Sequence, residues 1–467
     1  MRLIKKNTYL LLTILFSLVG SISVFSESAS AGSYYVAKDG SGQFLTIQAA
    51  LNAAQSGEIL IVKSGAYNEL ISFPRQGVTL KAMNGEVVTI TQSGRVMNID
   101  QPNLVIEGFI LDGNWGASDA VVISSNANNL VLRNVEIKNS ARDCVDMAAP
   151  ANVLIEGSKI HDCIWVEVNE ITKVTTRNDA HGIVTLGVKG LTIRNTEIYY
   201  VSGDAIQLQY GGWDNVLVEG CRFWNTKLPS ARGGAPANSY IGENAIDTKY
   251  CEKDGRGRIY LKNITAYGWH SDYIENAAAF NLKHNIYAEA DGITCYESEI
   301  CFRARGPGPN GPNSNCGDTP LGGAWATIKN AVMYNSDKGV RYEDSIQNLH
   351  LYNNIFGNNL VAFFNSAGGY GSGFDVKNNL FYGSSKPSEA SHSSNLAAAS
   401  GFVNPATNDY HPLAGASWID AGIDIAEVII DRDANRRISG EYDVGAFEYK
   451  GVSDTTPPAA PSGLTVR

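Results

Sequence analysis

The sequence is poor in proline and in positive charge. Its 467 residues include 15 prolines, and 37 lysine and arginine residues stand against 47 aspartate and glutamate residues, for a formal net charge of -10. A net negative chain disfavours nucleic acid as a partner, because the phosphate backbone attracts basic surfaces. The same charge would repel an acidic polymer unless cations gather locally.

Long apolar runs are missing beyond the first residues. Residues 9–24 form one apolar run, which follows Arg2, Lys5 and Lys6 and precedes the small residues Ala29-Ser30-Ala31. This is the pattern of a secretory signal peptide. We predict a signal over residues 1–31, a secreted protein, and no membrane span, since no later stretch has the roughly 20 apolar residues that a span needs.

Paired CxxC motifs are also absent, so a cysteine-ligated zinc site is not indicated. Seven cysteines in an exported chain permit disulfides and leave one cysteine over. Cys295, Cys301 and Cys316 lie close enough in the sequence to staple a loop.

The dominant feature is a repeat of short strand-like segments with the pattern apolar-x-apolar-x-(Asn/Gly). A spacing near two dozen residues predicts a solenoid, and Asn or Gly suits a left-handed turn residue that stacks from coil to coil. A left-handed β-roll or a leucine-rich horseshoe would have shorter or leucine-dominated units. The fifth positions of the repeat are Gly108, Asn134, Gly157, Asn195, Gly220, Asn263, His284, Asn330, Asn353 and Asn378.

We therefore expect an all-β, right-handed parallel β-helix over residues 32–385, closed at its N-terminal end by a helix at residues 46–54. Residues 386–450 resemble the small C-terminal module (the choice-of-anchor type) of secreted β-helices, and we expect a cap there. Residues 451–467 resemble a linker leading toward a fibronectin type III domain, which would allow attachment to a cell surface. We expect a monomer.

Three insertions lengthen the repeat, at residues 164–179, 226–243 and 306–323. All three flank the same strand position of the coil. Long loops inside a compact domain are more often functional than accidental. We expect them to wall a groove over one sheet.

Polar residues concentrate on the outward positions of that sheet. Alignment of the strands places Asp204, Gln207 and Gln209 beside Asn244, Asp247 and Lys249, with Asp272 and Glu275 on the next coil and Arg303 on the one after. Lys249 suits a general base, with a pKa lowered by Arg303 and a bound cation, and Arg303 suits a carboxylate clamp. The predicted substrate-binding residues are His181, Gln207, Gln209, Asn244, Arg305 and Arg341.

The acidic residues on adjacent coils suit Ca²⁺, which takes six to eight oxygen ligands. The predicted ligands are Asp204, Asp247, Asp272 and Glu275. An alternative is a set of surface carboxylates offset by Lys249 and Arg303, with no metal.

The solenoid, the turn asparagines and the strand 244–249 resemble the right-handed β-helix polysaccharide lyases, the pectate-lyase superfamily. The resemblance is to family nine pectate lyases, whose lysine base follows Asn-Ala-Asp-Gly, and to family six alginate and chondroitin lyases. It implies Lys249 as base, Arg303 and Glu275 in supporting roles, and Ca²⁺ as cofactor. Asn244 stands where family nine has an aspartate, so that ligand set is not fully reproduced.

The sequence therefore predicts a lyase that cleaves a uronic-acid polysaccharide by calcium-assisted β-elimination. Three alternatives stay open: a glycoside hydrolase with paired carboxylates such as Asp204 and Asp247, a uronate C5-epimerase, and a non-catalytic carbohydrate-binding solenoid.

Overall fold

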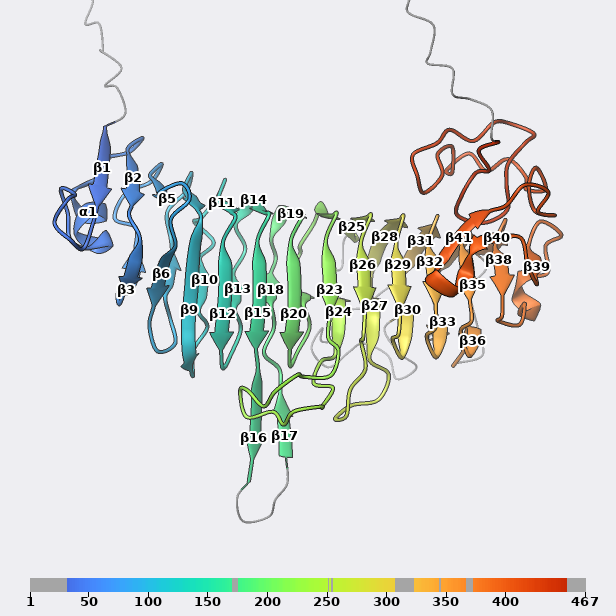
Figure 1. The fold of residues 1–467 in the computed structure, drawn as a ribbon, viewed down its shortest axis with the longest axis horizontal. Helices are drawn as coiled ribbons and strands as arrows, with labels where there is room; N and C mark the ends of the chain where they lie inside the picture. The colour runs from blue at the N-terminus through green and yellow to red at the C-terminus, as the bar shows by residue number, and fades with distance from the viewer. Residues whose placement is uncertain are drawn as a thin grey trace, which may run out of the picture.

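The protein is a right-handed parallel β-helix, as expected from the repeat (Figure 1). The computed structural model describes residues 32–169, 175–250, 252, 255–306, 323–343, 346–366 and 373–451. Three long parallel sheets, here named A, B and C, run along one axis, and each coil contributes a strand to each sheet in turn. Among the described residues, no helix has the length and apolarity that a membrane crossing requires.

Within the described residues, sheet A has thirteen strands that share one face of the solenoid. They are β1 Ser33–Val36, β2 Ile59–Val62, β5 Thr79–Ala82, β8 Val105–Glu107, β11 Val131–Arg133, β14 Ala151–Glu156, β19 Lys189–Arg194, β22 Val216–Glu219, β25 Gly257–Lys262, β28 Ile286–Asp291, β31 Trp325–Lys329, β34 Asn348–Tyr352 and β37 Gly373–Lys377.

Sheet B also has thirteen strands in the part of the chain that the structure describes, and it follows sheet A in most coils. They are β3 Gly65–Tyr67, β6 Val88–Thr91, β9 Phe109–Gly116, β12 Glu136–Ser140, β15 Lys159–Cys163, β20 Glu197–Val201, β23 Arg222–Trp224, β26 Thr265–Tyr267, β29 Thr294–Tyr296, β32 Val332–Tyr334, β35 Ile355–Gly357, β38 Leu380–Tyr382 and β39 Leu396–Ala398.

Sheet C carries the candidate site and has eleven strands among the described residues. They are β4 Ile71–Ser72, β7 Met97–Ile99, β10 Val121–Ile123, β13 Val145–Met147, β18 Ile183–Leu186, β21 Ile206–Gln209, β24 Asn244–Thr248, β27 Ala278–Lys283, β30 Ile300–Arg305, β33 Lys338–Glu343 and β36 Val361–Asn365.

The N-terminal end is closed by the helix that the sequence predicts. Helix α1 spans Ile47–Ala53, and the Thr46 hydroxyl accepts a hydrogen bond from the Ala49 amide as its N-cap. Ile47, Ala50 and Leu51 are buried in the solenoid core. The helix thus covers apolar side chains that the first coil would otherwise expose.

The Asn and Gly turn positions have left-handed backbone, with φ of 52° at Asn134, 60° at Gly157 and 50° at Asn195. The two residue types alternate through the middle coils for a steric reason. A Cβ on Gly157 would lie 2.4 Å from Asn134 Oδ1, and one on Gly220 would lie 2.6 Å from Asn195 Oδ1. Each asparagine side chain therefore fills the space above the glycine of the next coil.

One strand of the predicted repeat was assigned to the wrong sheet. The segment that ends at His284 lies in sheet C as β27, and the turn glycine of that coil is Gly292, with φ of 70°. The apolar-x-apolar-x pattern is the same in sheets A and C, because both bury alternate side chains. This error shifts every expected neighbour of β24 on its C-terminal side.

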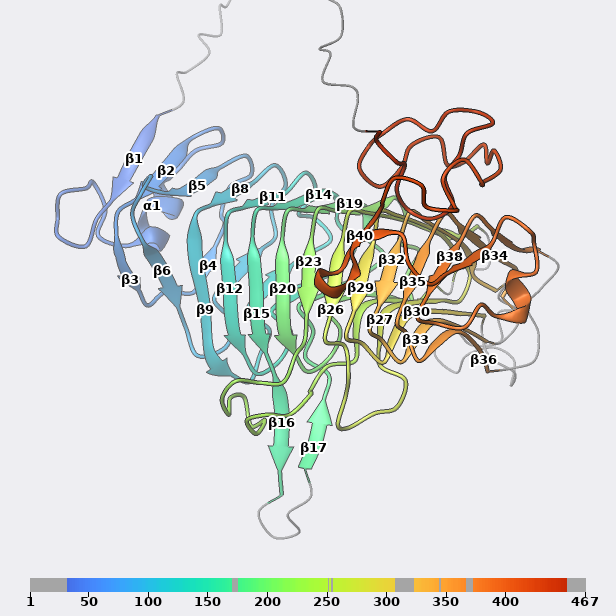
Figure 2. The ribbon, with the colours of Figure 1, turned by 45° about the vertical axis from the view of Figure 1, so that its right-hand side comes forward.

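The first two insertions form a projection at the edge between sheets B and C (Figures 1 and 2). The hairpin of β16 Trp165–Val168 and β17 Thr175–Asn178 extends away from the solenoid. Its Ile164 and Val166 pack with Leu228, Ala235 and Ile241 of the second insertion in a separate small core. Residues 307–322 of the third insertion lie outside the described residues.

The C-terminal segment divides into two parts. The 3₁₀ helix Ser388–Ala390 buries Ala390 in the main core, and β39 extends sheet B. The remainder, with β40 Phe402–Asn404, the 3₁₀ helix Pro405–Thr407 and β41 Asp409–Pro412, lies along the side of the last coils (Figure 2). It accepts hydrogen bonds there from Asn353 Nδ2 at Asp443 O (3.0 Å) and from Asn378 Nδ2 at Ile423 O (2.7 Å).

Two disulfides link described residues: Cys144–Cys163 joins sheet C to sheet B, and Cys295–Cys301 closes a short loop. The second confirms part of the expected staple, while Cys316 lies outside the described residues. Cys221 is a buried free thiol.

Sheet B carries a row of stacked aromatic rings on its outer face. Neighbouring ring centres lie 4.1–6.1 Å apart, with interplanar angles of 3–11°. The Arg222 guanidinium lies 5.0 Å from the Trp224 ring and 5.2 Å from the Tyr267 ring. We name this row the aromatic ladder; its members are His161, Tyr199, Trp224, Tyr267, Tyr296 and Tyr334.

Candidate functional site

Strand β24 sets the centre of the site. Ile246 and Thr248 point inward, so the alternation of a strand turns Asp247 outward. The Asp247 carboxylate lies 3.2 Å from Lys249 Nζ and 2.9 Å from Lys283 Nζ. Two cations from neighbouring coils therefore share one buried carboxylate, and both lysine side chains stay partly exposed, by 18% and 13%.

The coil before β24 is placed as predicted. Gln207 is the register partner of Asp247, and Lys249 Nζ donates a hydrogen bond to Gln207 Oε1. Gln209 lies on the same strand as Gln207, with its Nε2 3.4 Å from Gln207 Oε1. The ring of Tyr210 completes the surroundings of Lys249, with its centre 5.6 Å from Nζ.

The coil after β24 differs from the prediction. The register partner of Asp247 is Asn281 of β27, and Asp272 and Glu275 lie in the segment before that strand. Asp272 instead accepts a hydrogen bond from the Tyr240 amide at 2.9 Å. Tyr240 belongs to the projection formed by the first two insertions, which we name the wall. The acidic neighbours expected on this coil were thus wrong. Lys283 lies in their place on the outer face of sheet C, which we name the floor of the site.

A group of arginines continues the floor on later coils. Arg303 is the partner of Asn281, and Arg341 is the partner of Arg303. Arg305 is paired in register with Lys283. Arg303 forms an ion pair with Glu343, and Arg341 Nε lies 3.3 Å from the same carboxylate. Among the described residues of this region, the positive charges outnumber the negative ones.

We name the edge of the floor where strands of sheet C begin the lip. It holds His181, Asp204 and Asn244. Asn244 donates to Asp204 Oδ1 from its backbone N (3.0 Å) and its Nδ2 (2.7 Å). The Asp204 amide donates to His181 Nδ1 at 2.8 Å. All three side chains are buried. The structure brings them together, in a packed lip and not on an open surface, and their roles stay predictions.

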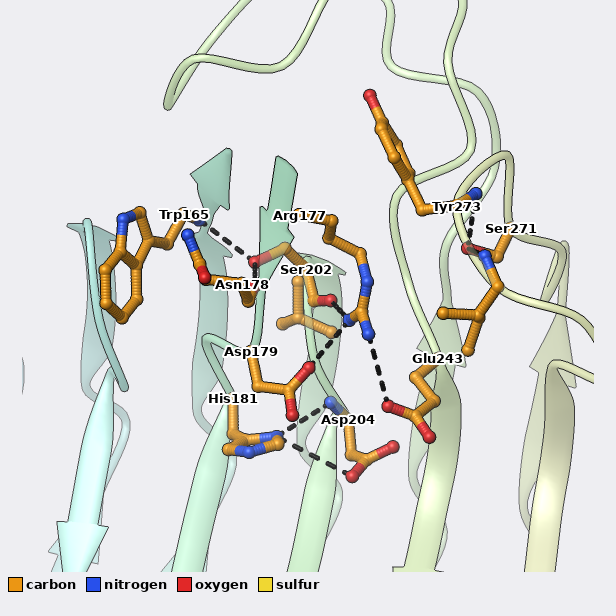
Figure 3. Close-up of polar contacts among 12 residues, drawn as sticks. Trp165, Arg177, Asn178, Asp179, His181, Ser202, Asp204, Glu243, Ser271 and Tyr273 are labelled. Atoms are coloured by element: carbon orange, nitrogen blue, oxygen red, sulfur yellow. Dashed lines mark hydrogen bonds and ion pairs between the residues drawn. The ribbon is translucent and has the colours of Figure 1, made fainter. Parts of the chain in front are cut away.

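Arg177 fastens the projecting hairpin to this lip, as Figure 3 shows. Its guanidinium lies 2.9 Å from Asp179 Oδ1 and 3.5 Å from Glu243 Oε2, and it donates to the Ser202 carbonyl. The side chain of Arg177 is 8% exposed. This residue therefore connects the hairpin, the lip and the start of β24.

The charges of the site shift several pKa values. Burial opposes ionisation of Asp247, but Lys283 and Lys249 outweigh it and lower the pKa of this carboxyl. Burial likewise opposes the charge on Lys249, yet Asp247 holds the pKa of Lys249 above its ordinary value. This direction is opposite to the lowered pKa that the sequence suggested.

The lip groups respond mainly to burial. Burial raises the pKa of Asp204 well above its usual range, and the Glu243 and Asp247 carboxylates add to that shift. Burial lowers the pKa of His181 to about 4, so its imidazole is neutral at pH 7. The site thus holds a buried carboxyl with a raised pKa, Asp204, a carboxylate with a lowered pKa, Asp247, and a neutral histidine.

The four predicted calcium ligands do not fit a calcium site in this arrangement. Asp247 is engaged by two lysines, Asp204 by Asn244, and Asp272 by the wall, while Glu275 lies in the same segment as Asp272. Within the described part of the chain, no three His, Cys, Asp or Glu side chains are grouped so that they could hold a metal ion.

Lys283 and Arg177 are among the residues of the site that were not predicted. Lys283 carries a signal, since it follows an alternating strand, but it was missed because that strand was assigned to sheet A. Arg177 lies in an insertion with no repeat, and nothing in the sequence around it indicates its contacts.

The fold and the site together define a right-handed β-helix with a cationic floor on one sheet. A family model described as a right handed beta helix region matches residues 94–300, from just before β7 to the first residue of β30. No curated protein sequence matches the chain.

Solved structures of other proteins share the fold. A rhamnogalacturonan lyase matches with a TM-score of 0.50 and 12% identity, over 80% of this chain and 91% of its own. Pectate lyase Pel9A matches with a TM-score of 0.47 and 16% identity, over 90% of this chain and 97% of its own. The Streptococcus pneumoniae surface protein and adhesin PfbA matches with a TM-score of 0.47 and 12% identity, over 75% of this chain and 90% of its own. At 12% identity, the likeness to the rhamnogalacturonan lyase shows the fold alone.

Proposed function

We propose that this protein is a polysaccharide lyase that cleaves a uronic-acid polymer bound across sheet C. The observation that carries the proposal is the row of cations on three adjacent coils, Lys249, Lys283 and Arg303. In a chain of net charge -10, such a local concentration favours an acidic ligand over a neutral one. Arg305 and Arg341 extend the row.

The proposed reaction is β-elimination. Lys283 and Arg303 neutralise the uronate carboxylate, which acidifies the proton on C5. Neutral Lys249 takes that proton, the C4–C5 double bond forms, and the bond from C4 to the glycosidic oxygen breaks. The leaving oxygen takes up a proton, and the products are a new reducing end and an unsaturated uronate.

The protonation of Lys249 limits this reaction. Asp247 raises the pKa of Lys249, so the neutral amine is a minor species at pH 7 and becomes more abundant in alkali. We therefore expect turnover to rise with pH through the alkaline range. No step of the proposal uses Ca²⁺, because three of the four predicted ligands, Asp204, Asp247 and Asp272, are engaged by other groups.

A glycoside hydrolase is the second candidate. Asp204 has a raised pKa and Asp247 a lowered one, and such a split is how paired carboxyls divide acid and base roles. Both side chains are 1% exposed, whereas Lys249 and Lys283 are more accessible. Accessibility favours the lyase.

The test is a screen of acidic polysaccharides at several pH values, with two readouts. Ultraviolet absorbance detects unsaturated uronate ends, and a reducing-sugar assay detects every cleavage. The proposal expects both signals in proportion, and their loss in Lys249→Ala but not in the matched variant Lys262→Ala, whose lysine is exposed on sheet A. Reducing ends without absorbance would identify the hydrolase instead.

Secretion belongs to the same proposal. Two disulfides among the described residues are typical of an oxidising compartment, and they support the signal peptide predicted over residues 1–31. An acidic polysaccharide outside the cell is then the expected substrate. A monomer, and attachment to a cell surface through further C-terminal domains, stay predictions.

A further inference from the structure

We infer that the polysaccharide alternates uronates with uncharged sugars, so that the sugar beside the attacked uronate, on the early-coil side of Lys249, is uncharged. This inference rests on the proposed function and deepens it. Its basis is an asymmetry along sheet C: the floor is cationic on one side of Lys249 and lacks that excess of cations on the other.

The late-coil side has several cations for few acids. Lys283, Arg303, Arg305 and Arg341 occupy the outward positions of β27, β30 and β33, with Glu343 as the acid among them. Successive strands of a sheet lie about 4.8 Å apart. A uronate carboxylate over Lys249 would therefore find a second and a third cation within two coils.

The early-coil side has a cavity in place of such a row. It has a volume of about 660 Å³ and is lined by Ala149, Leu186, Gly187, Lys189, Gly211, Gly212, Tyr250 and Glu252. Among the residues that the structure describes, its charged residues are one lysine and one glutamate, which offer no net attraction for an anion. Leu186 is 50% exposed there, at the end of the strand that pairs with β21.

Glycines let neighbouring coils approach closely beside this cavity. A Cβ on Gly211 would lie 2.7 Å from the Gly187 amide nitrogen, and one on Gly212 would lie 2.9 Å from Glu252 Cγ. Gly187 itself has φ of 82°, which side chains disfavour. The backbone thus forms the floor, with Leu186 and Tyr250 as the apolar surfaces beside it. Such surfaces suit the carbon face of a sugar ring.

A uronate would be disfavoured in this cavity. Its carboxylate would face Glu252, and further along the sheet lie Asp119, Asp143 and Asp146, against Arg95 and Arg142. The nearest row of cations begins at Lys249, where the attacked residue is already bound. An uncharged sugar avoids both the desolvation of a carboxylate and the repulsion.

The first experiment compares polymers. Lys249→Ala is titrated by calorimetry with polygalacturonate and polymannuronate, which are continuous polyuronates, and with chondroitin and a rhamnogalacturonan backbone, in which uronates alternate with uncharged sugars. Wild-type turnover is measured on all four by ultraviolet absorbance. We expect at least one alternating polymer to exceed both polyuronates by tenfold or more, in affinity and in kcat/KM.

Equal or better binding and cleavage of the polyuronates would overturn the inference while leaving the lyase intact. Binding without unsaturated products on any polymer would overturn the lyase, and the ranking of affinities would then decide the inference alone. If none of the four polymers binds, the inference is wrong.

The second experiment changes the cavity. Leu186→Lys places a cation beside the early-side sugar, and it should raise kcat/KM on polygalacturonate or polymannuronate relative to the alternating polymer by about tenfold. The matched variant Leu360→Lys adds the same charge at a leucine that is 76% exposed before β36, and it should leave that ratio unchanged. An unchanged ratio in Leu186→Lys would contradict the inference.

Discussion

The outer faces of sheets B and C are built on the same coils and differ in what their outward columns repeat. On sheet B, one chemical type recurs over six coils as the aromatic ladder, and each ring stacks on its neighbours. On sheet C, the column through Asp247 changes at every coil, from Val184 to Gln207, Asp247, Asn281 and Arg303. Side chains of one type that repeat from coil to coil contact one another and so stabilise the solenoid. A column whose residue type changes at each coil leaves polar groups that can contact a ligand.

The largest effect is expected for Lys249→Ala, which should reduce kcat far more than it reduces stability. Lys249→Ala should lower kcat by about 10²–10⁴-fold, the range for loss of a general base, with only a moderate fall in the thermal midpoint, because Lys283 still pairs with the buried Asp247 carboxylate. Steady-state kinetics on the best substrate, with a melting curve, check this. A variant that keeps near wild-type turnover would make Lys249 a surface ion-pair residue.

The second contrast concerns the charge beside Lys249. Asp247→Asn removes the carboxylate that raises the pKa of Lys249, so the rising limb of kcat against pH should move to lower pH, by about one unit or more. Asp272→Asn is the control, since Asp272 lies in the wall, and its profile should match the wild type. A limb that stays in place would show that another group sets it.

The third contrast is made on sheet B. Tyr267→Ala interrupts the aromatic ladder and should lower the free energy of unfolding by about 1–3 kcal/mol, because two stacked contacts of about 0.5–1.5 kcal/mol each are lost. Turnover should stay within about twofold. Tyr35→Ala, at a tyrosine 37% exposed on sheet A, should cost less. A larger effect on kcat than on stability would give sheet B a part in the site.

The smallest expected effect is that of chelation. Treatment with a chelator should leave kcat/KM within about twofold, because Asp247 is engaged by lysines and the predicted ligands are dispersed. Turnover assays before and after treatment, with Ca²⁺ added back, check this. A loss that Ca²⁺ restores would show that the site rearranges around a cation.

The repeat made most of the fold predictable from the sequence. Alternating apolar residues with Asn or Gly after them identify the coils, and the helix that ends at Ala53 follows from its apolar spacing. On the early side of β24 the alignment also gave the correct neighbours, Gln207 beside Asp247.

The prediction failed where two strands had the same pattern. The strand ending in Lys283 fits sheet A and sheet C equally well by alternation, and only the length of the preceding segment, which contains Asp272 and Glu275, separates the two. Contacts within the insertions, such as those of Arg177, depend on loop conformations that no periodicity encodes. The roles assigned to Lys249 and Arg303 stay predictions.

The alternation of Asn and Gly at the turns makes the solenoid modular in pairs of coils. If one asparagine coil were removed, glycine would stand over glycine and leave a gap, whereas asparagine over asparagine is tolerated, as at Asn353 and Asn378. A spliced protein that gained or lost two coils at a time would keep every turn filled. The solenoid could thus be lengthened by design, two coils at a time, without changing the residues at its turns.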